Sequence, residues 1–322
     1  MAKIKYNDGS LYTGDVRNGV PHGRGTLKYG NGDWYEGDFY DNELHGYGTF
    51  KYTNGNTYQG QFSHGNFHGK GTKFFKDGAK YEGDYVNGIE EGYGTYYYPS
   101  GAYYKGQFKN GYFEGQGTKV YKDGTKSEGS FKNDHEHGYC TMWFVPSGWY
   151  QGEFVEGKFH GEGAIEYTNG DKYKGQFVNG KAHGQGTMWF NPTGWYIGSF
   201  ENGKFNGQGT IEFSNGDKYE GPFVNGKPNG KGTMWFKEGG WYQGDFVDGL
   251  FQGEGSTGFS NGDKYTGTFE NGMVHGYGTC WFENEDVYRG EFRNGKLHGE
   301  GEMWYADGTY YKGQFANGRK VE

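Results

Sequence analysis

The sequence predicts an all-β protein, an elongated single-sheet antiparallel meander of consecutive β-hairpins in the form of a rod or trough. Three observations support this prediction. A unit of 23 residues repeats along the chain without insertion or deletion, aromatic residues and glycines hold fixed places in that unit, and turn-forming residues bracket each pair of expected strands. Such a chain is stabilised mainly by contacts between neighbouring units.

The composition fits this class and limits the possible functions. Aliphatic residues are scarce, but aromatic residues make up 20% of the 322 residues and the net charge is only -8, so the chain is not disordered. The pI near 5.7 argues against nucleic acid as a partner. Cys140 and Cys280 lie far apart, which indicates no disulfide framework and a reducing, cytoplasmic compartment. The N-terminus has no apolar signal core, and no apolar stretch approaches the length of a membrane span.

Each unit is anchored by one tyrosine. Steps of 23 residues from Tyr12 to Tyr311 meet Tyr at thirteen of fourteen positions, and Ser127 is the exception. Gly follows two places later in every unit, and an aromatic residue follows four places later in all but the first, which has Val16. A complete copy of the pattern is Tyr-x-Gly-x-Phe-x-x-Gly-x-x-x-Gly-x-Gly-Thr at residues 173–187.

The first expected strand of this copy is 173–177, and the second is 184–190. Because side chains alternate along a strand, Tyr and Phe share a face with a Gly between them, and a neighbouring ring can cover the gap at that Gly. With two strands per unit, roughly 28 strands are expected. The relative faces of the two strands stay open, since a turn shifted by one residue reverses a face.

Two kinds of turn separate these strands. Turns between units are Asn-Gly, as at residues 169–170, or Pro-x-Gly, as at residues 146–148. The turn within a unit carries Gly at twelve of fourteen sites, and Asn42 and Asp134 occupy the other two. Both of these residues tolerate a positive φ, so the exceptions follow the needs of the backbone.

Residues 12–318 closely resemble a series of MORN (membrane occupation and recognition nexus) repeats. The expected organisation is an N-terminal half repeat (1–11), repeats 1–5 (12–126), a degenerate repeat 6 (127–149), repeats 7–13 (150–310) and a C-terminal half repeat (311–322). Ser127, Asp134 and Cys140 are all off pattern in repeat 6. This indicates either a bend in the array or tolerated drift.

From repeat 6 onward the units alternate with a period of 46 residues. One type carries tryptophans around a turn, and the other carries Lys172, Lys218 or Lys264 after its turn. The tryptophans form either a ladder that binds a partner or a duplicated unit in which they pack on each other. The candidate partner-binding residues are Trp143, Trp149, Trp189, Trp195, Trp235, Trp241, Trp281 and Trp304.

The sequence predicts no enzyme, no catalytic residue, no cofactor and no metal site. Histidines such as His183 recur once in most units, but adjacent units are about 10 Å apart, whereas zinc ligands lie about 2 Å from the ion. The Gly-x-Gly pattern lacks the helix that a phosphate-binding loop requires. MORN repeats also occur beside lysine methyltransferase and lipid-kinase domains, but here the repeats take up the whole chain.

The resemblance implies a structural scaffold, since similar MORN proteins commonly lie in cytoskeletal assemblies such as ciliary axonemes. The expected partners are other proteins, as a helix or an extended peptide in an aromatic groove. The alternative is a membrane adaptor that binds phosphoinositides through Lys172, Lys218 and Lys264, although the acidic total counts against it. The last unit ends after its first expected strand, so Tyr311 and Phe315 form a candidate edge for homodimerisation or strand addition, unless Arg319 and Lys320 protect that edge.

Overall fold

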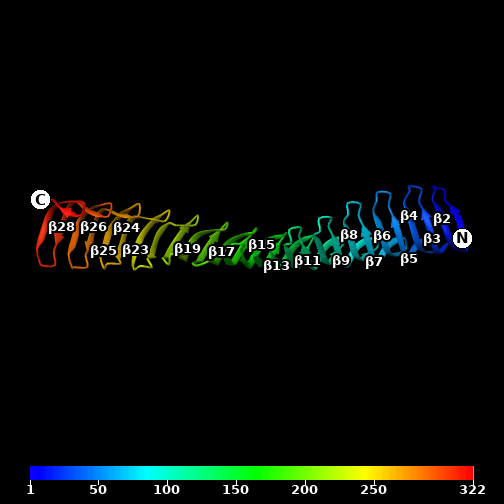
Figure 1. Ribbon diagram of the computed structural model, residues 1–322, viewed down its shortest axis with the longest axis horizontal. Coiled ribbons are helices and arrows are strands. Elements are labelled where there is room, and N and C mark those ends of the chain that lie inside the picture. The colour runs from blue at the N-terminus through cyan, green and yellow to red at the C-terminus, as the bar shows by residue number, and fades with distance from the viewer. Residues whose placement is uncertain (322) are drawn as a thin grey trace. The chain divides into compact units, whose positions relative to one another are not determined.

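The computed structural model describes residues 1–321, which contain thirty β-strands and no α-helix (Figure 1). No helix long and apolar enough to cross a membrane occurs in this part of the chain. The chain divides into two compact units, Met1–Phe159 and the residues from His160 onward. Within each unit, every strand pairs antiparallel with the strands that precede and follow it in the sequence. The predicted all-β meander of hairpins is therefore confirmed.

The first unit contains β1 (Ala2–Lys5), β2 (Leu11–Arg17), β3 (Val20–Lys28), β4 (Trp34–Tyr40), β5 (Glu43–Lys51), β6 (Thr57–Ser63), β7 (Asn66–Phe74), β8 (Lys80–Val86), β9 (Ile89–Tyr97), β10 (Tyr103–Lys109), β11 (Tyr112–Val120), β12 (Lys126–Lys132), β13 (His135–Trp143) and β14 (Trp149–Val155). The boundary between the units falls at the start of β15 (Lys158–Glu166). The second unit continues with β16 (Lys172–Val178), β17 (Lys181–Trp189), β18 (Trp195–Glu201), β19 (Lys204–Glu212), β20 (Lys218–Val224), β21 (Lys227–Pro228), β22 (Gly230–Trp235), β23 (Gly240–Val247), β24 (Leu250–Phe259), β25 (Lys264–Glu270), β26 (Met273–Trp281), β27 (Val287–Arg293), β28 (Lys296–Trp304), β29 (Tyr310–Ala316) and β30 (Arg319–Lys320).

The strand count exceeds the expected one at two places. The short strand β30 pairs with the end of β29, so the last unit does not stop after one strand. One expected strand is split into β21 and β22 around Asn229, whose N–H donates to the carbonyl of Pro222 (2.9 Å). Pro222 stands where Asp38 and Gln61 accept a backbone N–H from the facing strand, a bond that a proline side chain cannot make.

The pairing register settles the relative faces of the two strands in a repeat. Tyr12 faces Leu27 and Gly14 faces Gly25, and directly opposed residues share a face. The anchoring tyrosine therefore lies on the same face as both glycines. Asn-Gly and Pro-x-Gly turns give the same register, since Glu166 faces Lys172 across the first kind and Trp143 faces Trp149 across the second.

The anchoring tyrosines form the core of each unit. The Tyr58 ring is fully buried and stacks on Phe67 with ring centroids 3.7 Å apart. It meets Phe62 of its own strand edge-on (5.1 Å) and Tyr85 of the next repeat edge-on (5.2 Å). Edge-to-face ring pairs stabilise by about 0.5–1.5 kcal/mol beyond the burial of their area. Each ring thus stabilises its own hairpin and links it to the next one.

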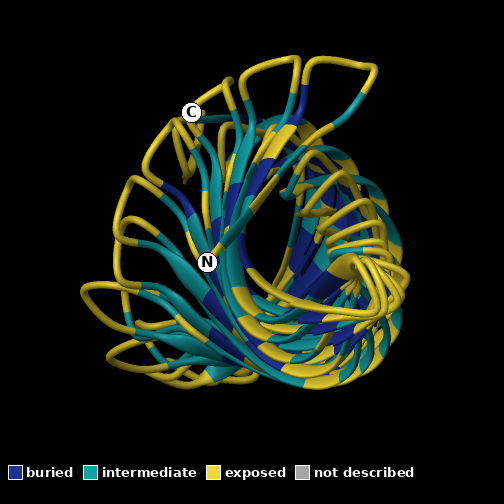
Figure 2. Ribbon diagram, turned by 90° about the vertical axis from the view of Figure 1, so that its right-hand side faces the viewer, coloured by how far each residue is buried: buried dark blue, intermediate teal, exposed yellow. Residues whose placement is uncertain are grey.

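Glycine is required where these rings cross the hairpin. A Cβ atom added to Gly71 would lie 2.3 Å from the Tyr58 hydroxyl, and one added to Gly60 would lie 2.5 Å from the Cα of Gly71. The predicted cover of the glycine gap by an aromatic ring is confirmed. Figure 2 shows the result, with buried segments along the strands and exposed turns at their ends.

The two kinds of turn differ in their use of positive φ. In the turn within a repeat two successive residues adopt it, as at Asn179 (50°) and Gly180 (81°), which is the type I′ pattern. Asn42 and Asp134 adopt φ of 70° and 71°, as predicted. In the Asn-Gly turns between repeats only the glycine has a positive φ, for example 86° at Gly170. The sequence therefore identified where both kinds of turn lie.

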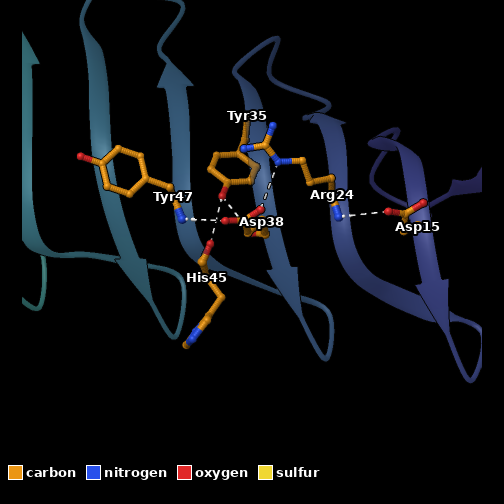
Figure 3. Close-up of polar contacts among 6 residues, drawn as sticks. All are labelled: Asp15, Arg24, Tyr35, Asp38, His45 and Tyr47. Atoms are coloured by element: carbon orange, nitrogen blue, oxygen red, sulfur yellow. Dashed lines mark hydrogen bonds and ion pairs between the residues drawn. The ribbon is translucent and has the colours of Figure 1, made fainter.

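A bulge follows the first glycine in many of the hairpins, and in repeat 2 Asp38 organises it (Figure 3). The Asp38 carboxylate accepts the N–H of Tyr47 (2.9 Å) and lies 3.4 Å from Nε of Arg24. Its backbone carbonyl accepts the hydroxyl of Tyr35 (2.9 Å). Asp38 therefore links the anchoring tyrosine, the bulge and the facing strand through hydrogen bonds.

Repeat 6 keeps this arrangement with different side chains. Ser127 replaces the tyrosine and Cys140 replaces the second-strand glycine. The Cys140 thiol donates to the carbonyl of Ser130 (3.1 Å), the position whose carbonyl accepts the tyrosine hydroxyl in other repeats. Beside it, the buried Glu136 accepts the hydroxyl of Tyr121 (2.5 Å). A bend at this repeat stays a prediction.

Candidate binding surface

In each of the two units, the tryptophans occupy a single row of side chains on the sheet face opposite the tyrosine core, and all nine tryptophans of the chain take this position. The row follows from the register, in which the residue before each anchoring tyrosine faces the last residue of the neighbouring second strand on either side. We call it the tryptophan row. In the first unit it contains Lys5, Leu11, Lys28, Trp34, Lys51, Thr57, Phe74, Lys80, Tyr97, Tyr103, Val120, Lys126, Trp143 and Trp149. In the second unit it contains Glu166, Lys172, Trp189, Trp195, Glu212, Lys218, Trp235, Trp241, Gly258, Lys264, Trp281, Val287, Trp304 and Tyr310.

Five of these tryptophans are strongly exposed. Their exposed fractions lie between 39% and 44%, and the five are Trp143, Trp189, Trp235, Trp281 and Trp304. The anchoring tyrosines and phenylalanines already fill the core on the other face. The tryptophans are therefore presented to solvent from rigid strands, which is the typical setting of an aromatic anchor in a protein interface.

Tryptophans meet as direct pairs across the Pro-x-Gly turns. Three such pairs are directly opposed in the strand register: Trp143 with Trp149, Trp189 with Trp195, and Trp235 with Trp241. The indole Nε1 of Trp195 also donates to the carboxylate of Glu212 (3.1 Å). The structure thus brings the predicted partner-binding residues together in one row within each unit, but it does not decide between a binding ladder and a duplicated unit.

The 46-residue alternation extends to the core face. Alternate repeats place a phenylalanine flat against the anchoring tyrosine, as Phe205 does on Tyr196 (3.8 Å). In the repeats between them the same position carries a smaller residue, such as Ala182 or Pro228. The exposed tryptophan closing the second strand belongs to repeats of this second kind, for example Trp189 and Trp235.

Several lysines lie beside aromatic residues in the tryptophan row. Nζ of Lys80 lies 4.3 Å from the ring centroid of Tyr97, and Nζ of Lys218 lies 5.4 Å from that of Trp235. Such contacts are attractive and hold the ammonium group at the ring face. Lys172, Lys218 and Lys264, the candidate lipid contacts, all lie in this row, and Lys172 pairs with Glu166 (3.3 Å).

The face that carries the row is hollowed in both units. One hollow of about 840 Å³ has Gly221, Gly232 and Thr233 in its lining, with Trp235. Another, of about 500 Å³, includes Trp143. On this face the lining side chains include the small Thr233 and Ser256 beside the longer Lys231 and Gln243. This shape suits a narrow partner that lies across the strands.

His22 contacts a neighbouring repeat, and both cysteines are buried in the fold. His22 Nδ1 lies 3.2 Å from a carboxylate oxygen of Asp41 in a turn of the next repeat. Within residues 1–321, no three His, Cys, Asp or Glu side chains group as metal ligands would. Cys140 and Cys280 are buried free thiols, and burial raises the pKa of each, to about 11 and about 12.

The two candidate edge residues differ in exposure. Phe315 is buried and packs edge-on against Tyr288 (4.9 Å). Tyr311 donates its hydroxyl to the carbonyls of Gln314 and Val321 (3.3 and 3.1 Å). Phe315 also pairs with Lys320 of β30. Association through this edge stays a prediction.

Sequence reasoning missed Trp34 and the lysines of the first unit. The tryptophan alternation begins only at repeat 6, so a single earlier Trp did not stand out. The signal was present, because Trp34 and Trp149 each precede an anchoring tyrosine. Lys28 and Lys51 could be placed in the row only once the register across the turns was known.

The solved structures that resemble this chain are remote from it. The TCP domain of SAS-4 (dCPAP) of Drosophila melanogaster, in complex with a proline-rich motif of Ana2 (dSTIL), is 12% identical with a TM-score of 0.24, over 54% of this chain and 83% of that chain. The TCP10 domain of Danio rerio CPAP, in complex with a peptide of Danio rerio STIL, is 10% identical with a TM-score of 0.25, over 82% and 92%. A streptogramin B lyase is 10% identical with a TM-score of 0.14, over 83% and 81%. TM-scores this low carry no inference about function.

No curated protein matches the sequence. The family model described as MORN repeat matches thirteen consecutive segments, at residues 12–34, 35–57, 58–80, 81–103, 104–126, 128–148, 150–172, 173–192, 196–218, 219–241, 242–264, 265–287 and 288–310. These segments follow the 23-residue unit, and each begins at or beside the position of an anchoring tyrosine. The chain therefore belongs to the MORN-repeat family.

Proposed function

We propose that this protein is a non-enzymatic scaffold that binds other proteins through its tryptophan row. One observation carries the proposal: all nine tryptophans lie in this row, on the sheet face opposite the buried tyrosines and phenylalanines. Tryptophan is enriched among the residues that contribute most to protein interfaces. Thirteen MORN repeats between residues 12 and 310 support a surface built from repeated units as the basis of this function.

The test compares two pairs of aromatic substitutions in the full chain. One variant carries Trp189→Ser and Trp235→Ser in the row. The control carries Tyr40→Ser and Tyr112→Ser, which are each 52% exposed but lie beside the turns within repeats. Proximity labelling in the native cell should lose a set of labelled proteins in the tryptophan variant and keep it in the tyrosine control. Circular dichroism establishes that both variants are folded.

Labelling that is unchanged in the tryptophan variant would contradict the proposal. Equal losses in both variants would also contradict it, because they would assign binding to exposed aromatic residues in general. The tyrosine control separates loss of the row from loss of exposed aromatic residues in general, because its substituted residues lie beside the turns and not in the row.

We propose further that the protein works within a cytoskeletal or ciliary assembly. This proposal is supported by analogy with MORN proteins of similar sequence pattern and is independent of the binding surface. Fluorescence microscopy of the tagged full chain in its native cell tests it. Co-localisation with tubulin-based or other cytoskeletal structures is expected, and a uniform cytoplasmic signal would contradict it.

A membrane adaptor is the second candidate, because Lys172, Lys218 and Lys264 lie in the same row as exposed tryptophans. Juxtaposed lysines and aromatic rings can bind anionic lipid headgroups. The protein's net charge of -8 opposes such binding. Sedimentation with phosphoinositide-containing vesicles tests this candidate, and absence of salt-sensitive binding removes it.

A further inference from the structure

The tryptophan row of the first unit is basic although the protein is acidic overall. Five residues of this row carry a charge, and all five are lysines: Lys5, Lys28, Lys51, Lys80 and Lys126. The corresponding row of the second unit includes Glu166 and Glu212 as well as lysines. The two units therefore present different electrostatic surfaces at the same structural position.

Three of these five ammonium groups lie beside aromatic rings, and that of Lys80 is 4.3 Å from the ring centroid of Tyr97. Nζ of Lys51 lies 4.9 Å from the ring centroid of Trp34, and Nζ of Lys126 lies 4.9 Å from that of Trp143. Lys80 and Lys126 are also ion-paired, to Glu82 (3.0 Å) and Glu128 (2.7 Å). Lys28 and Lys51 are exposed and form no ion pair within the described part of the chain. Their charges are consequently open to a partner.

Carboxylates lie on the same face at two distances from the row. Glu36, Glu82 and Glu128 lie two residues along their strands from Trp34, Lys80 and Lys126, which corresponds to about 7 Å. Asp15, Asp38 and Asp84 lie four residues along their strands from Leu11, Trp34 and Lys80, which corresponds to about 13 Å. Asp38 and Asp84 accept backbone N–H groups of the facing strand (2.9 and 3.1 Å). A flat anionic surface would approach both sets of carboxylates. A narrow chain along the row would avoid Asp15, Asp38 and Asp84 and would meet the lysines of the row that form no ion pair in the described residues, which include Lys28 and Lys51.

We propose that the tryptophan row of the first unit docks an extended acidic polypeptide segment that runs across the strands. The proposal rests on the proposed function and names the chemistry of the partner. From Lys5 on β1 to Lys126 on β12 the row crosses eleven strand spacings, which is about 50 Å and matches an extended segment of roughly 16 residues. Acidic segments suit this site because their own charges repel and keep them extended. Their carboxylates complement the lysines, and their apolar or aromatic side chains can contact the rings between the lysines.

The test uses fluorescein-labelled polyglutamate of about 20 residues as the probe for the full chain. One variant carries Lys28→Gln, Lys51→Gln, Lys80→Gln and Lys126→Gln. The matched control carries Lys76→Gln, Lys109→Gln, Lys122→Gln and Lys132→Gln, which changes the net charge equally at exposed lysines near the turns. Fluorescence anisotropy measures affinity, and intrinsic tryptophan emission reports contact with the row, since every tryptophan lies in it.

The row variant should bind the probe about tenfold more weakly, whereas the control should change by less than about twofold, because each exposed charge contributes a small amount. Binding of the unsubstituted protein should weaken with added salt. If the row variant does not fold, the double variant Lys28→Gln and Lys51→Gln replaces it, since these two lysines make no ion pair in the described residues.

Equal loss in both quadruple variants, or no binding by the unsubstituted protein, overturns the proposal. Binding to phosphatidylserine vesicles that needs the row lysines, without binding to polyglutamate, overturns it in favour of a membrane. Failure of this inference can be distinguished from failure of the proposed function. If the tryptophan substitutions remove cellular partners while the row lysine substitutions do not, the scaffold function stands and the acidic partner is rejected.

Discussion

The hydroxyl group of Tyr35 donates a 2.9 Å hydrogen bond to the backbone carbonyl of Asp38, three residues further along the same strand. The same bond joins Tyr58 to Gln61 and Tyr219 to Pro222. It forms whatever side chain the acceptor residue carries, so the backbone of the bulge determines it. The bond directs the ring across the glycine pair of the hairpin, and this ring in turn contacts the next repeat.

Removing only the hydroxyl of Tyr35 tests the value of this bond. Tyr35→Phe keeps the ring and leaves the carbonyl of Asp38 without its donor. We expect a loss of about 1 kcal/mol in the free energy of unfolding, the usual net value of a neutral hydrogen bond. The midpoint of urea unfolding measures it. Tyr47→Phe is the control, because Tyr47 is 57% exposed; equal midpoints for the two variants would argue against a structural role for the hydroxyl.

The glycine beneath the ring should be irreplaceable for steric reasons alone. In Gly25→Ala the new Cβ atom would lie 2.4 Å from Cε2 of Tyr12. We expect a loss of about 1–3 kcal/mol, as for other overpacked sites. Gly19→Ala is the comparison, since no atom lies within 4 Å of its Cβ position and its cost arises only from the φ of 78°. A smaller loss at Gly25 than at Gly19, measured by thermal unfolding, would show that the ring moves aside easily.

Most of the hairpin architecture could be predicted because the same local pattern of aromatic, glycine and turn residues occurs in thirteen repeats. The alternation of Tyr and Gly, the turn residues and the exceptions at Asn42 and Asp134 all depend on backbone conformation within a few residues. The relation between strand faces could not be predicted, because it depends on the length of each turn to within one residue. The composition of the tryptophan row depends on that relation and was therefore identified only in part.

Repeat 6 shows a second feature that could not be predicted from the sequence. Ser127 and Cys140 each depart from the pattern and suggest loss of structure when they are considered separately. In the structure they complement each other, because the thiol of Cys140 takes over the hydrogen bond to Ser130 that a tyrosine would make. Only the spatial overlap of the two positions reveals this compensation.

A double-mutant cycle at Ser127 and Cys140 tests the compensation. Ser127→Tyr alone should destabilise the protein, because the Sγ of Cys140 already lies 2.8 Å from the Cβ position of Gly129, where the ring would pass. Adding Cys140→Gly should recover stability by opening that space. We expect a coupling of about 1–3 kcal/mol between the two sites. Additive melting temperatures for the four proteins would mean that the two residues act independently.

The tyrosine core predicts sensitivity to alkaline pH. Burial raises the pKa of Tyr196, Tyr242, Tyr265 and Tyr288 to about 12, against about 10 for an unfolded chain. The folded state holds these protons more tightly, so their contribution to stability is complete below pH about 10 and is lost as the pH rises towards 12. Melting temperatures from circular dichroism should fall across this interval, with the absorbance of tyrosinate appearing together with unfolding. Stability that stays constant up to pH about 12 would exclude a core closed by neutral tyrosines.

Oxidative footprinting in the native cell tests the binding role of the tryptophan row most directly. Mass spectrometry would compare the oxidation of Trp189, Trp235 and Trp281 in the purified full chain and inside the cell, with Tyr40 and Tyr112 as exposed references. A partner-covered row predicts tryptophans that are readily oxidised in the purified protein and protected in the cell, while the two tyrosines react alike in both. Tryptophans that are as reactive in the cell as in isolation would contradict it.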